Sequence, residues 1–340
     1  MKAMVLAAGL GTRLRPLTDD KPKALVTLAG KTLLEITLLT LRFVGVEEVI
    51  VNVHHFADMI CDYLDKNGNF GMRIEISHEE AELLDTGGGL KKASWFFLEN
   101  EVDTREDSAT PRPSPCLIPP EGERENSPGQ AKRSPGSDFN LVGAPRRGAA
   151  NERTIDAGDT ASGRKLPSSE SSVTGHDFGR AESMQKTGEA LAPAGDEPFI
   201  LHNVDVLSAI DLSRMIRHHI DQGALATLAV QDRETSRYLL FDENGHLCGR
   251  RIGRDGNDEM AHPAAHPQPL AFAGIHVISP RLLAEMREEG AFSIIDTYLN
   301  LASRGEKIAA FRADEYYWRD LGRPENLADA ERDLASGINA

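Results

Sequence analysis

The chain has 340 residues, a formal net charge of −15 and a hydrophobic fraction of 40%. The hydrophobic fraction is ordinary for globular proteins, so we expect a large part of the chain to fold around a core. The acidic charge argues against general binding of nucleic acid, because a phosphate backbone would be repelled. Small phosphorylated ligands remain compatible with it, since a few local cations and amide groups suffice to hold them.

Cysteine usage and hydropathy narrow the class of protein further. Cys61, Cys116 and Cys248 are far apart and form no CxxC pair, which argues against a zinc cage or a disulfide framework. We find no run of about 18 apolar residues and no signal-peptide pattern, so we expect a cytoplasmic protein without a membrane partner. The oligomeric state is not indicated by the sequence.

Residues 1–100 alternate between strand and helix patterns. Strands are predicted over 1–7, 47–53 and 72–79, and helices over 33–45, over 56–68 and from 85 onward. Such β-α-β alternation predicts an α/β fold with a mostly parallel sheet flanked by helices. We expect this segment to form the nucleotide-binding half of the protein.

Residues 101–195 differ in composition from the rest. Ten of the eighteen prolines fall here, and only 11 of these 95 residues are Leu, Ile, Val or Phe. So few apolar groups cannot offset the entropy lost when a chain is ordered. We therefore predict a long disordered insertion between a helix and the next strand.

Residues 196–340 again carry patterns of regular structure. Strands are predicted over 198–206, 226–232 and 272–279, a hairpin over 237–249, helices over 211–222 and 292–305, and a turn followed by a helix over 316–336. This segment is the expected second half, with the sugar-phosphate and metal sites.

A glycine loop follows the first predicted strand. Gly9 and Gly11 allow a ligand to approach the backbone closely, because glycine has no Cβ. The dinucleotide pattern GxGxxG would need glycine where Leu14 stands, and the GK[ST] of a Walker loop is absent. Arg13 and Lys23 instead add a guanidinium and an ammonium group, a combination that suits a triphosphate.

The complete segment, LAAGLGTRLRPLT followed by KPKAL, resembles the signature LAAGxGTRLxPLT…KP of the sugar-1-phosphate nucleotidyltransferases. The resemblance implies a Rossmann-like fold of the nucleotide-diphospho-sugar transferase type. It also implies that Arg13 and Lys23 are the catalytic cations, with Lys23 also reaching the sugar phosphate. The nucleotide contacts it implies in this loop are Leu6, Ala7, Ala8, Gly9, Gly11, Thr12 and Arg13.

Two further segments are similar to the family's pattern. Thr86, Gly87 and Gly88 open a predicted helix, where family members pack on the base and ribose. The TGGG form is most similar to the N-acetylmuramate 1-phosphate uridylyltransferase branch, with mannose-1-phosphate guanylyltransferases also close. UTP or GTP is therefore the expected donor. The strand containing Gly274 resembles the one that holds the sugar in the family.

Two aspartates match the family's metal ligands. Asp205 ends a predicted strand in HNVDV, where Val204 replaces the family's usual glycine, and Asp320 lies in WRDLGRPENL. A carboxylate at the carboxyl edge of a parallel sheet is well placed to bind a metal ion. Two such groups with water and phosphate oxygens suit Mg²⁺, the expected cofactor.

The expected activity is transfer of a nucleoside monophosphate from a nucleoside triphosphate to a sugar 1-phosphate, with release of pyrophosphate. Three alternatives remain open: a phosphocholine cytidylyltransferase, a non-catalytic regulatory subunit of the same fold, and a glycosyltransferase that uses a nucleotide sugar. The retention of both cations and both aspartates argues against a non-catalytic subunit. The N-terminal signature argues against the glycosyltransferase.

The insertion hypothesis leads to a deletion test. Replacement of residues 103–194 by a short Gly/Ser linker should leave a folded, active protein, because none of the motifs lies inside the segment and α/β connections need only a few residues. Solubility, circular dichroism and activity would be compared with those of the full chain. Limited proteolysis of the full chain should cut first between 101 and 195. A deletion variant that is insoluble, or that folds but loses its selectivity for the sugar, would show that the segment is an ordered lid or interface.

Overall fold

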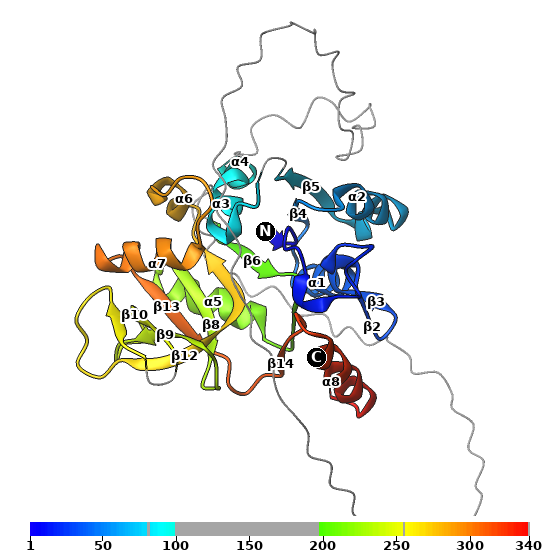
Figure 1. Cartoon of the computed structure of the whole chain (residues 1–340). Helices are drawn as coiled ribbons and strands as arrows, with labels where there is room; N and C mark the ends of the chain where they lie inside the picture. Colours follow the sequence, from blue (N-terminus) through cyan, green and yellow to red (C-terminus); the bar gives the residue numbers. More distant parts are fainter. Residues whose placement is uncertain (80–81, 99–196, 254–255, 339–340) are drawn as a thin grey trace, which may run out of the picture. The chain divides into compact units, whose positions relative to one another are not determined.

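Strand β1 (Lys2–Leu6) lies between two parallel neighbours in a ten-stranded sheet. The computed structural model describes residues 1–79, 82–98, 197–253 and 256–338 (Figure 1), which all fall in one compact unit. The predicted insertion over 101–195 lies outside the described residues, so that hypothesis stays a prediction.

The sheet follows the order β11-β10-β9-β12-β6-β1-β4-β5, and β8 pairs with both β12 and β13. Its other strands are β4 (Glu48–Val53), β5 (Arg73–His78), β6 (Phe199–Asn203), β8 (Ala226–Gln231), β9 (Arg237–Phe241), β10 (Leu247–Ile252), β11 (Asp258–Met260), β12 (Gln268–Ile278) and β13 (Ile308–Arg312). Strands β6, β1, β4 and β5 are parallel, which confirms the predicted parallel sheet for the nucleotide half. Because β12 runs antiparallel to β6, β8 and β9, the whole sheet is mixed.

Alternating side chains of β1 divide the core into two layers. Ala3 and Val5 belong to one apolar cluster and Met4 to the other, because successive side chains of a strand point to opposite faces. The first cluster takes in α1 (Leu33–Phe43), α2 (Ala57–Lys66), α5 (Leu212–Gln222) and α8 (Pro324–Ala335). The second takes in α3 (Asp85–Lys92), α4 (Ser94–Leu98), α6 (Arg281–Glu285) and α7 (Ile294–Ser303). The result is a sheet with helices on both faces, as predicted.

Local signals in the sequence account for several element ends. The Thr32 side chain caps α1 by accepting a hydrogen bond of 3.0 Å from the backbone N–H of Glu35. Asp211 caps α5 in the same way, and Gly223 ends that helix in a left-handed conformation with φ of 57°. These caps explain why the predicted helix boundaries agree with the structure to within a few residues.

The structure differs from the predicted elements chiefly in the second half. The strand predicted over 198–206 is broken at Val204 and Asp205, which form a turn between β6 and the short strand β7 (Val206–Ser208). Strand β7 pairs with β14 (Trp318–Asp320), which lies where only a turn was expected. A second two-stranded ladder joins β2 (Thr27–Leu28) to β3 (Lys31–Thr32). Strands of three residues or fewer carry too little alternation to be recognised in a sequence.

Of the helices that the structure describes, none has the length and apolar character required to cross a membrane. The longest, α8, has 12 residues, fewer than the roughly 20 that a bilayer core needs.

Two buried histidines on neighbouring strands make the fold sensitive to acid. Burial lowers the pKa of His202 on β6 from 6.5 to about 4, and that of His276 on β12 from 6.5 to about 3. Below about pH 6.5 these two histidines are therefore protonated in the unfolded chain but remain neutral in the folded chain. We expect the free energy of unfolding to fall between pH 6.5 and 4, by roughly 1.4 kcal/mol per histidine for each pH unit.

Urea unfolding measured from pH 7.5 down to pH 5 would test this expectation. The His276→Gln variant should lose about half of the pH dependence, whereas His55→Gln, at an exposed position, should keep all of it. An equal pH dependence in His276→Gln and in the original chain would contradict the assignment.

Candidate active site

A cleft opens at the edge of the sheet where the parallel strands β6, β1, β4 and β5 end. Its cavity volume is about 170 Å³. The residues that line it are Leu6, Ala8, Gly9, Lys23, Asn52, Glu79, Leu83, Asp85, Thr86, Asn203, Val204 and Asp205. Six of the residues predicted from the sequence are among them, so segments far apart in the chain meet at the carboxyl edge of the sheet, where α/β proteins bind ligands.

An asparagine of β4 forms hydrogen bonds with the backbone at the start of the glycine loop. The Asn52 side-chain oxygen accepts hydrogen bonds from the backbone N–H groups of Ala7, at 2.7 Å, and Ala8, at 3.4 Å. Its amide nitrogen donates to the Glu79 carboxylate over 2.8 Å. The second oxygen of Glu79 accepts from the backbone N–H of Leu84 at 2.9 Å, just before α3. One chain of hydrogen bonds therefore connects the two segments predicted to hold the nucleotide.

Asn52 and Glu79 were not predicted as site residues. Both are almost fully buried and line the cleft. A polar side chain inside the otherwise apolar run VIVNV was the available signal in the sequence, because a buried amide needs hydrogen-bond partners. Glu79 had no such signal, since it follows β5 in a segment rich in acidic residues.

Gly11 occupies a position that only glycine fits well. Its φ of 63° lies in the left-handed region. A Cβ there would lie 3.0 Å from the Thr18 side chain and 3.1 Å from Cβ of Lys23. The Thr18 hydroxyl donates to the Gly11 carbonyl at 2.8 Å, so the loop folds back over the segment that carries Lys23.

Lys23 and Asp205 form an ion pair between the two halves of the chain. Their side chains are only 12% and 18% exposed, so the two charges meet in a partly desolvated place where their attraction is stronger than at the surface. Asp205 lies in the turn between β6 and β7, and its carbonyl accepts from the backbone N–H of Leu321 at 2.8 Å. The turn is therefore tied to the segment that follows β14.

The remaining predicted charges converge around Gly322. A Cβ added at Gly322 would lie within 3.4 Å of three charged groups, and these are Asp320 Oδ1 at 2.8 Å, Arg13 Nη2 at 3.0 Å and Asp205 Oδ2 at 3.4 Å. The backbone N–H of Gly322 donates to Asp320 at 2.7 Å. Since Lys23 pairs with Asp205, two cations and two carboxylates predicted from separate motifs meet at one place.

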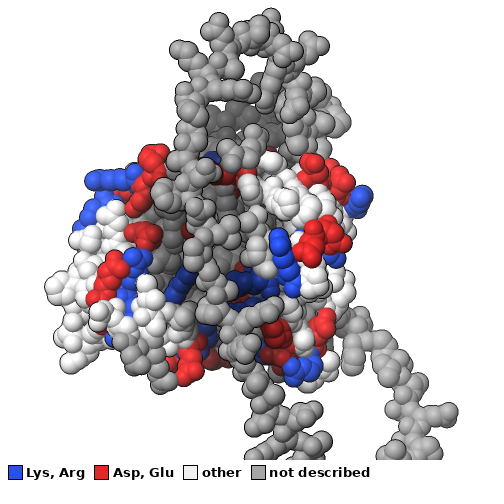
Figure 2. All heavy atoms as spheres, viewed as in Figure 1, with Lys and Arg blue, Asp and Glu red and all other residues white. Residues whose placement is uncertain are grey.

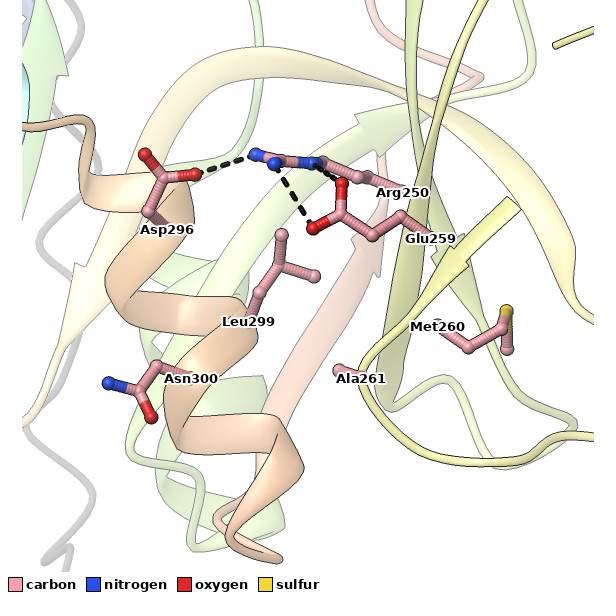
Figure 3. Close-up of a pocket in the computed structure, with 7 residues that line it drawn as sticks. All are labelled: Arg250, Glu259, Met260, Ala261, Asp296, Leu299 and Asn300. Atoms are coloured by element: carbon pink, nitrogen blue, oxygen red, sulfur yellow. Dashed lines mark hydrogen bonds and ion pairs between the residues drawn. The ribbon is translucent and has the colours of Figure 1, made fainter. Parts of the chain in front are cut away.

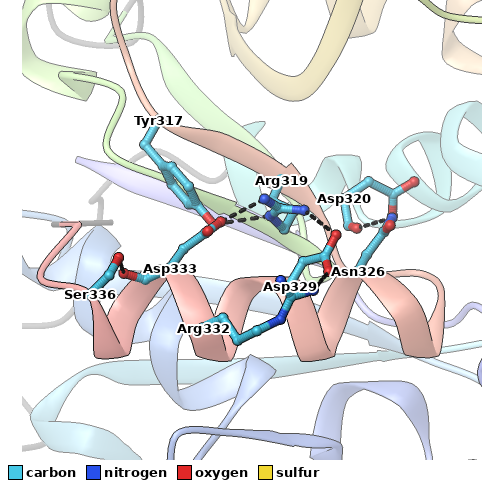
Figure 4. A network of polar contacts seen from close by, with 8 residues as sticks. All are labelled: Tyr317, Arg319, Asp320, Asn326, Asp329, Arg332, Asp333 and Ser336. Atoms are coloured by element: carbon cyan, nitrogen blue, oxygen red, sulfur yellow. Dashed lines mark hydrogen bonds and ion pairs between the residues drawn. The ribbon is translucent and has the colours of Figure 1, made fainter. Parts of the chain in front are cut away.

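Helix α8 fixes the strand that carries Asp320 (Figure 4). Arg319 pairs with Asp329 at 3.0 Å and with Asp333 at 2.6 Å, both on α8, and donates to the Tyr317 hydroxyl at 3.1 Å. The Asn326 side chain donates to the Asp320 carbonyl at 2.7 Å. These contacts hold both sides of Asp320, so the position of its carboxylate depends on the packing of α8.

Gly87 and Gly88, which were predicted to bind the nucleotide, contact the start of α7 in the structure, and their role towards a ligand stays a prediction. Their backbone N–H groups both donate to the Phe292 carbonyl, at 2.9 and 3.3 Å, and neither residue lines the cleft. A Cβ at Gly87 would lie 2.4 Å from the Phe292 ring. The glycines are therefore required where α3 packs against the start of α7, and Thr86 is the residue of this motif that borders the cleft.

Gly274 lies in an irregular part of β12 with φ of 77°. A Cβ there would lie 2.8 Å from the Val206 side chain and 3.0 Å from the Asn203 amide. Gly274 thus borders the predicted site through Asn203 rather than lining the cleft itself. Ala7, Gly11, Thr12, Arg13 and Asp320 likewise lie outside the lining of the cleft.

A larger hollow, of about 270 Å³, lies between β10, β11 and α7 (Figure 3). Its charged groups are paired with one another, because Arg250 contacts Glu259 at 2.7 Å and Asp296 at 2.6 Å. None of the predicted site residues lines it. The contacts in this hollow connect secondary-structure elements and indicate no chemistry.

The described residues contain no cluster of three or more His, Cys, Asp or Glu side chains suited to a metal ion. If the protein binds a metal ion here, Asp205 and Asp320 would supply two carboxylates, and water and substrate oxygens would supply the other ligands, as an ion such as Mg²⁺ allows. On the described part of the face in Figure 2, basic and acidic side chains are interspersed rather than gathered into one basic surface.

Comparisons with known proteins support the resemblance found in the sequence. Residues 2–105 match the family model described as nucleotidyl transferase. The N-acetylmuramate alpha-1-phosphate uridylyltransferase of Caulobacter vibrioides is 54% identical over 102 residues, which are 29% of this chain and 42% of that protein. A mannose-1-phosphate guanylyltransferase catalytic subunit beta of Xenopus tropicalis is 41% identical over 101 residues, which are 29% of this chain and 28% of that protein. The chain thus spans less than half the length of these relatives.

A solved structure extends the comparison to the second half. UDP-glucose pyrophosphorylase complexed with UDP-glucose aligns with 99% of this chain and 98% of its own, with a TM-score of 0.57 and 13% identity. At that identity the likeness concerns the fold alone, and it confirms the predicted fold class.

The crowding around Gly322 leads to a prediction. In Gly322→Ala the new methyl group would displace Asp320 or Arg13, because 2.8 Å is shorter than a normal carbon–oxygen contact. We expect the affinity for a nucleoside triphosphate with Mg²⁺ to fall by about tenfold or more, equivalent to about 1.4 kcal/mol. The melting temperature should change little, since the displaced groups are ends of flexible side chains.

Calorimetric titration and thermal unfolding would separate the two effects in Gly322→Ala. Ser303→Ala, at the exposed end of α7, is the control and should match the original chain in both measurements. Unchanged affinity in Gly322→Ala would show that ligands do not use the groups around this glycine.

Proposed function

We propose that the chain transfers a nucleoside monophosphate from a nucleoside triphosphate to a sugar 1-phosphate, because residues 2–105 match the family model described as nucleotidyl transferase. The products are a nucleotide sugar and pyrophosphate. The observation that carries this proposal is the meeting of Arg13, Lys23, Asp205 and Asp320 beside the glycine loop. A sheet edge with two cations and two carboxylates suits a reaction between phosphate groups.

The proposed reaction is an in-line displacement. A phosphate oxygen of the acceptor forms a bond to the α-phosphorus, the bond between that phosphorus and the β-phosphate oxygen breaks, and the electron pair leaves with pyrophosphate. The acceptor supplies the nucleophile, so no covalent intermediate with the protein is needed. Catalysis then consists of positioning the two phosphates and stabilising their charge.

Arg13 and Lys23 take different parts in this scheme. Arg13 donates hydrogen bonds to the leaving pyrophosphate through its fork-shaped guanidinium, which matches phosphate oxygens. Lys23 carries a compact charge and lines the cleft, and its ammonium group contacts the phosphates of both the donor and the acceptor. Asp205 keeps the ammonium group of Lys23 oriented through their ion pair.

The proposed cofactor is Mg²⁺, held by Asp205 and Asp320. When bound, it would neutralise charge on the phosphate oxygens. The two carboxylates meet beside Gly322, so the chain brings together the oxygen ligands that such an ion prefers.

UTP is the first donor to test, and GTP the second. A uridylyltransferase is the more similar of the two relatives described above, and the matched residues form the nucleotide half. The sugar is less constrained by that match, because the acceptor site lies in the second half of the chain. Phosphocholine with CTP is the alternative acceptor and donor pair, and absence of turnover with every pair would favour a non-catalytic subunit.

Pyrophosphate release from a panel of nucleoside triphosphates and sugar 1-phosphates, with and without Mg²⁺, would test the proposal. We expect turnover with UTP and a sugar 1-phosphate. Asp205→Asn and Asp320→Asn should each lower kcat by about 100-fold, as does loss of a group that stabilises charge in the transition state. Asp62→Asn, which changes an exposed carboxylate on α2 that pairs with Lys66, is the matched control and should keep its activity.

Two results would contradict the proposal. Near-normal turnover of both aspartate variants at limiting Mg²⁺ would remove the metal assignment. Turnover only with CTP and phosphocholine would replace the sugar acceptor.

A further inference from the structure

Arg233 lies just beyond β8, at the same edge of the sheet as the cleft. Strand β8 is antiparallel to β12, and β12 is antiparallel to β6, so β8 and β6 run in the same direction. The chain therefore leaves β8 towards Arg233 at the edge where it leaves β6 towards Asp205. Arg233 belongs to none of the motifs found in the sequence.

An irregularity of β12 fixes the position of the Arg233 guanidinium. The pairing of β12 with β8 shifts register between Phe272 and His276, on either side of Gly274. The Phe272 carbonyl accepts a hydrogen bond of 2.8 Å from Arg233, and the Ala273 carbonyl accepts one of 2.7 Å from the Trp318 ring N–H. The guanidinium carbon lies 3.7 Å from the centre of the Trp318 ring, so the group lies over the face of that ring.

Trp318 connects Arg233 to the candidate active site. Trp318 and Asp320 are two residues apart on β14, so their side chains point to the same face of that strand. Burial lowers the pKa of Arg233, and the charge of Asp320 opposes this effect. The arginine is thus close enough to the site to interact with its charges.

The guanidinium of Arg233 keeps hydrogen-bonding capacity that the described residues do not use. Its Nε is buried and has no hydrogen-bond partner, and the group forms no ion pair among the described residues. An arginine has five N–H donors in a rigid fork, of which one here donates to Phe272. A buried donor without a partner is costly, and an anion that accepts from Nε and a neighbouring N–H would remove that cost.

The position of Arg233 helps to decide between two anions that it could bind, the 1-phosphate of the acceptor and another anionic group on the sugar. One strand, β12, separates β8 from β6, so the ends of β8 and β6 are about 10 Å apart, two strand spacings. Lys23 and Asp205 stand at the end of β6, where the phosphate of the acceptor is expected. A pyranose ring spans about half of that separation. An anionic substituent on the far side of the sugar therefore fits the distance better than the 1-phosphate itself.

We propose that Arg233 binds a carboxylate carried by the acceptor sugar and so selects acidic sugar 1-phosphates over neutral ones. The inference rests on the proposed function, because it assigns the acceptor to this side of the site. The flat fork of an arginine matches a carboxylate, and its contact with the Trp318 ring holds it in one orientation. Arg233 would determine specificity and take no part in the phosphate chemistry.

Two acceptors that differ in one group give the sharpest test. N-acetylmuramate 1-phosphate carries a lactate ether with a carboxylate, and N-acetylglucosamine 1-phosphate lacks it. Affinity for each would be measured by calorimetry, and kcat and KM by pyrophosphate release with UTP. In Arg233→Gln we expect affinity for the acidic sugar to fall by about 10- to 100-fold, as when a site loses its partner for a charged group. Affinity for the neutral sugar and kcat should change less than about threefold.

Arg237→Gln is the matched control, because Arg237 is an exposed arginine at the start of β9 in the same stretch of chain. It should keep the preference of the original chain. If Arg233→Gln does not fold, Arg233→Lys replaces it. A lysine keeps the charge without the fork, and we expect a smaller loss of the same preference.

Three outcomes would overturn the inference. The first is that the original chain binds the acidic and the neutral sugar with equal affinity. The second is that Arg233→Gln keeps the preference for the acidic sugar. The third is that Arg233→Gln lowers the affinity for both sugars to the same extent. The last result would indicate that Arg233 binds the 1-phosphate or stabilises the fold. Calorimetry needs no turnover, so a chain that binds the acidic sugar through Arg233 but releases no pyrophosphate would disprove the proposed function alone.

Discussion

The ion pair between Lys23 and Asp205 is the contact on which the candidate active site depends. It joins residues 182 positions apart in the chain and connects the glycine loop of the first half to the turn after β6 in the second. The pair is partly buried, so removal of either partner would leave a charge without compensation in a place that water reaches poorly. The turn also helps to position Asp320, because the Asp205 carbonyl accepts a hydrogen bond from the backbone N–H of Leu321, the next residue in the chain. The nucleotide loop, the turn and the second carboxylate are therefore placed by one set of contacts.

Support for this arrangement comes from both faces of the sheet. On one side, Asn52 and Glu79 connect the backbone of the glycine loop to the start of α3 through buried hydrogen bonds. On the other, α8 holds β14 through Arg319 and Asn326. Because buried polar groups are stable only with partners in good geometry, these contacts also restrict how far the site can relax without ligand.

The two halves of the chain contribute different information about function. The nucleotide half carries nearly all of the recognisable signature and the similarity to known relatives. The second half shares a fold with solved nucleotidyltransferases at low identity, so its ligand must be inferred from its own side chains. At the register shift in β12, the Phe272 carbonyl accepts a hydrogen bond from Arg233, and the Ala273 carbonyl accepts one from Trp318. An irregularity in one strand thus creates the geometry from which the acceptor class is inferred.

The sequence by itself determined the α/β class, the order of most elements and the chemical types of the site residues. Helix caps such as Thr32 and Asp211 act within a few residues, and the glycine loop is one continuous segment, so both can be recognised locally. The meeting of Arg13 and Asp205 with Asp320 was inferred only through resemblance to a family. Asn52 and Glu79 were not recognised as residues of the cleft, and the packing of Gly87 and Gly88 against Phe292 was not foreseen. The physical reason is the same in each case: a side chain's role depends on partners brought next to it by strand order and register, and those partners are tens to hundreds of residues away in the chain.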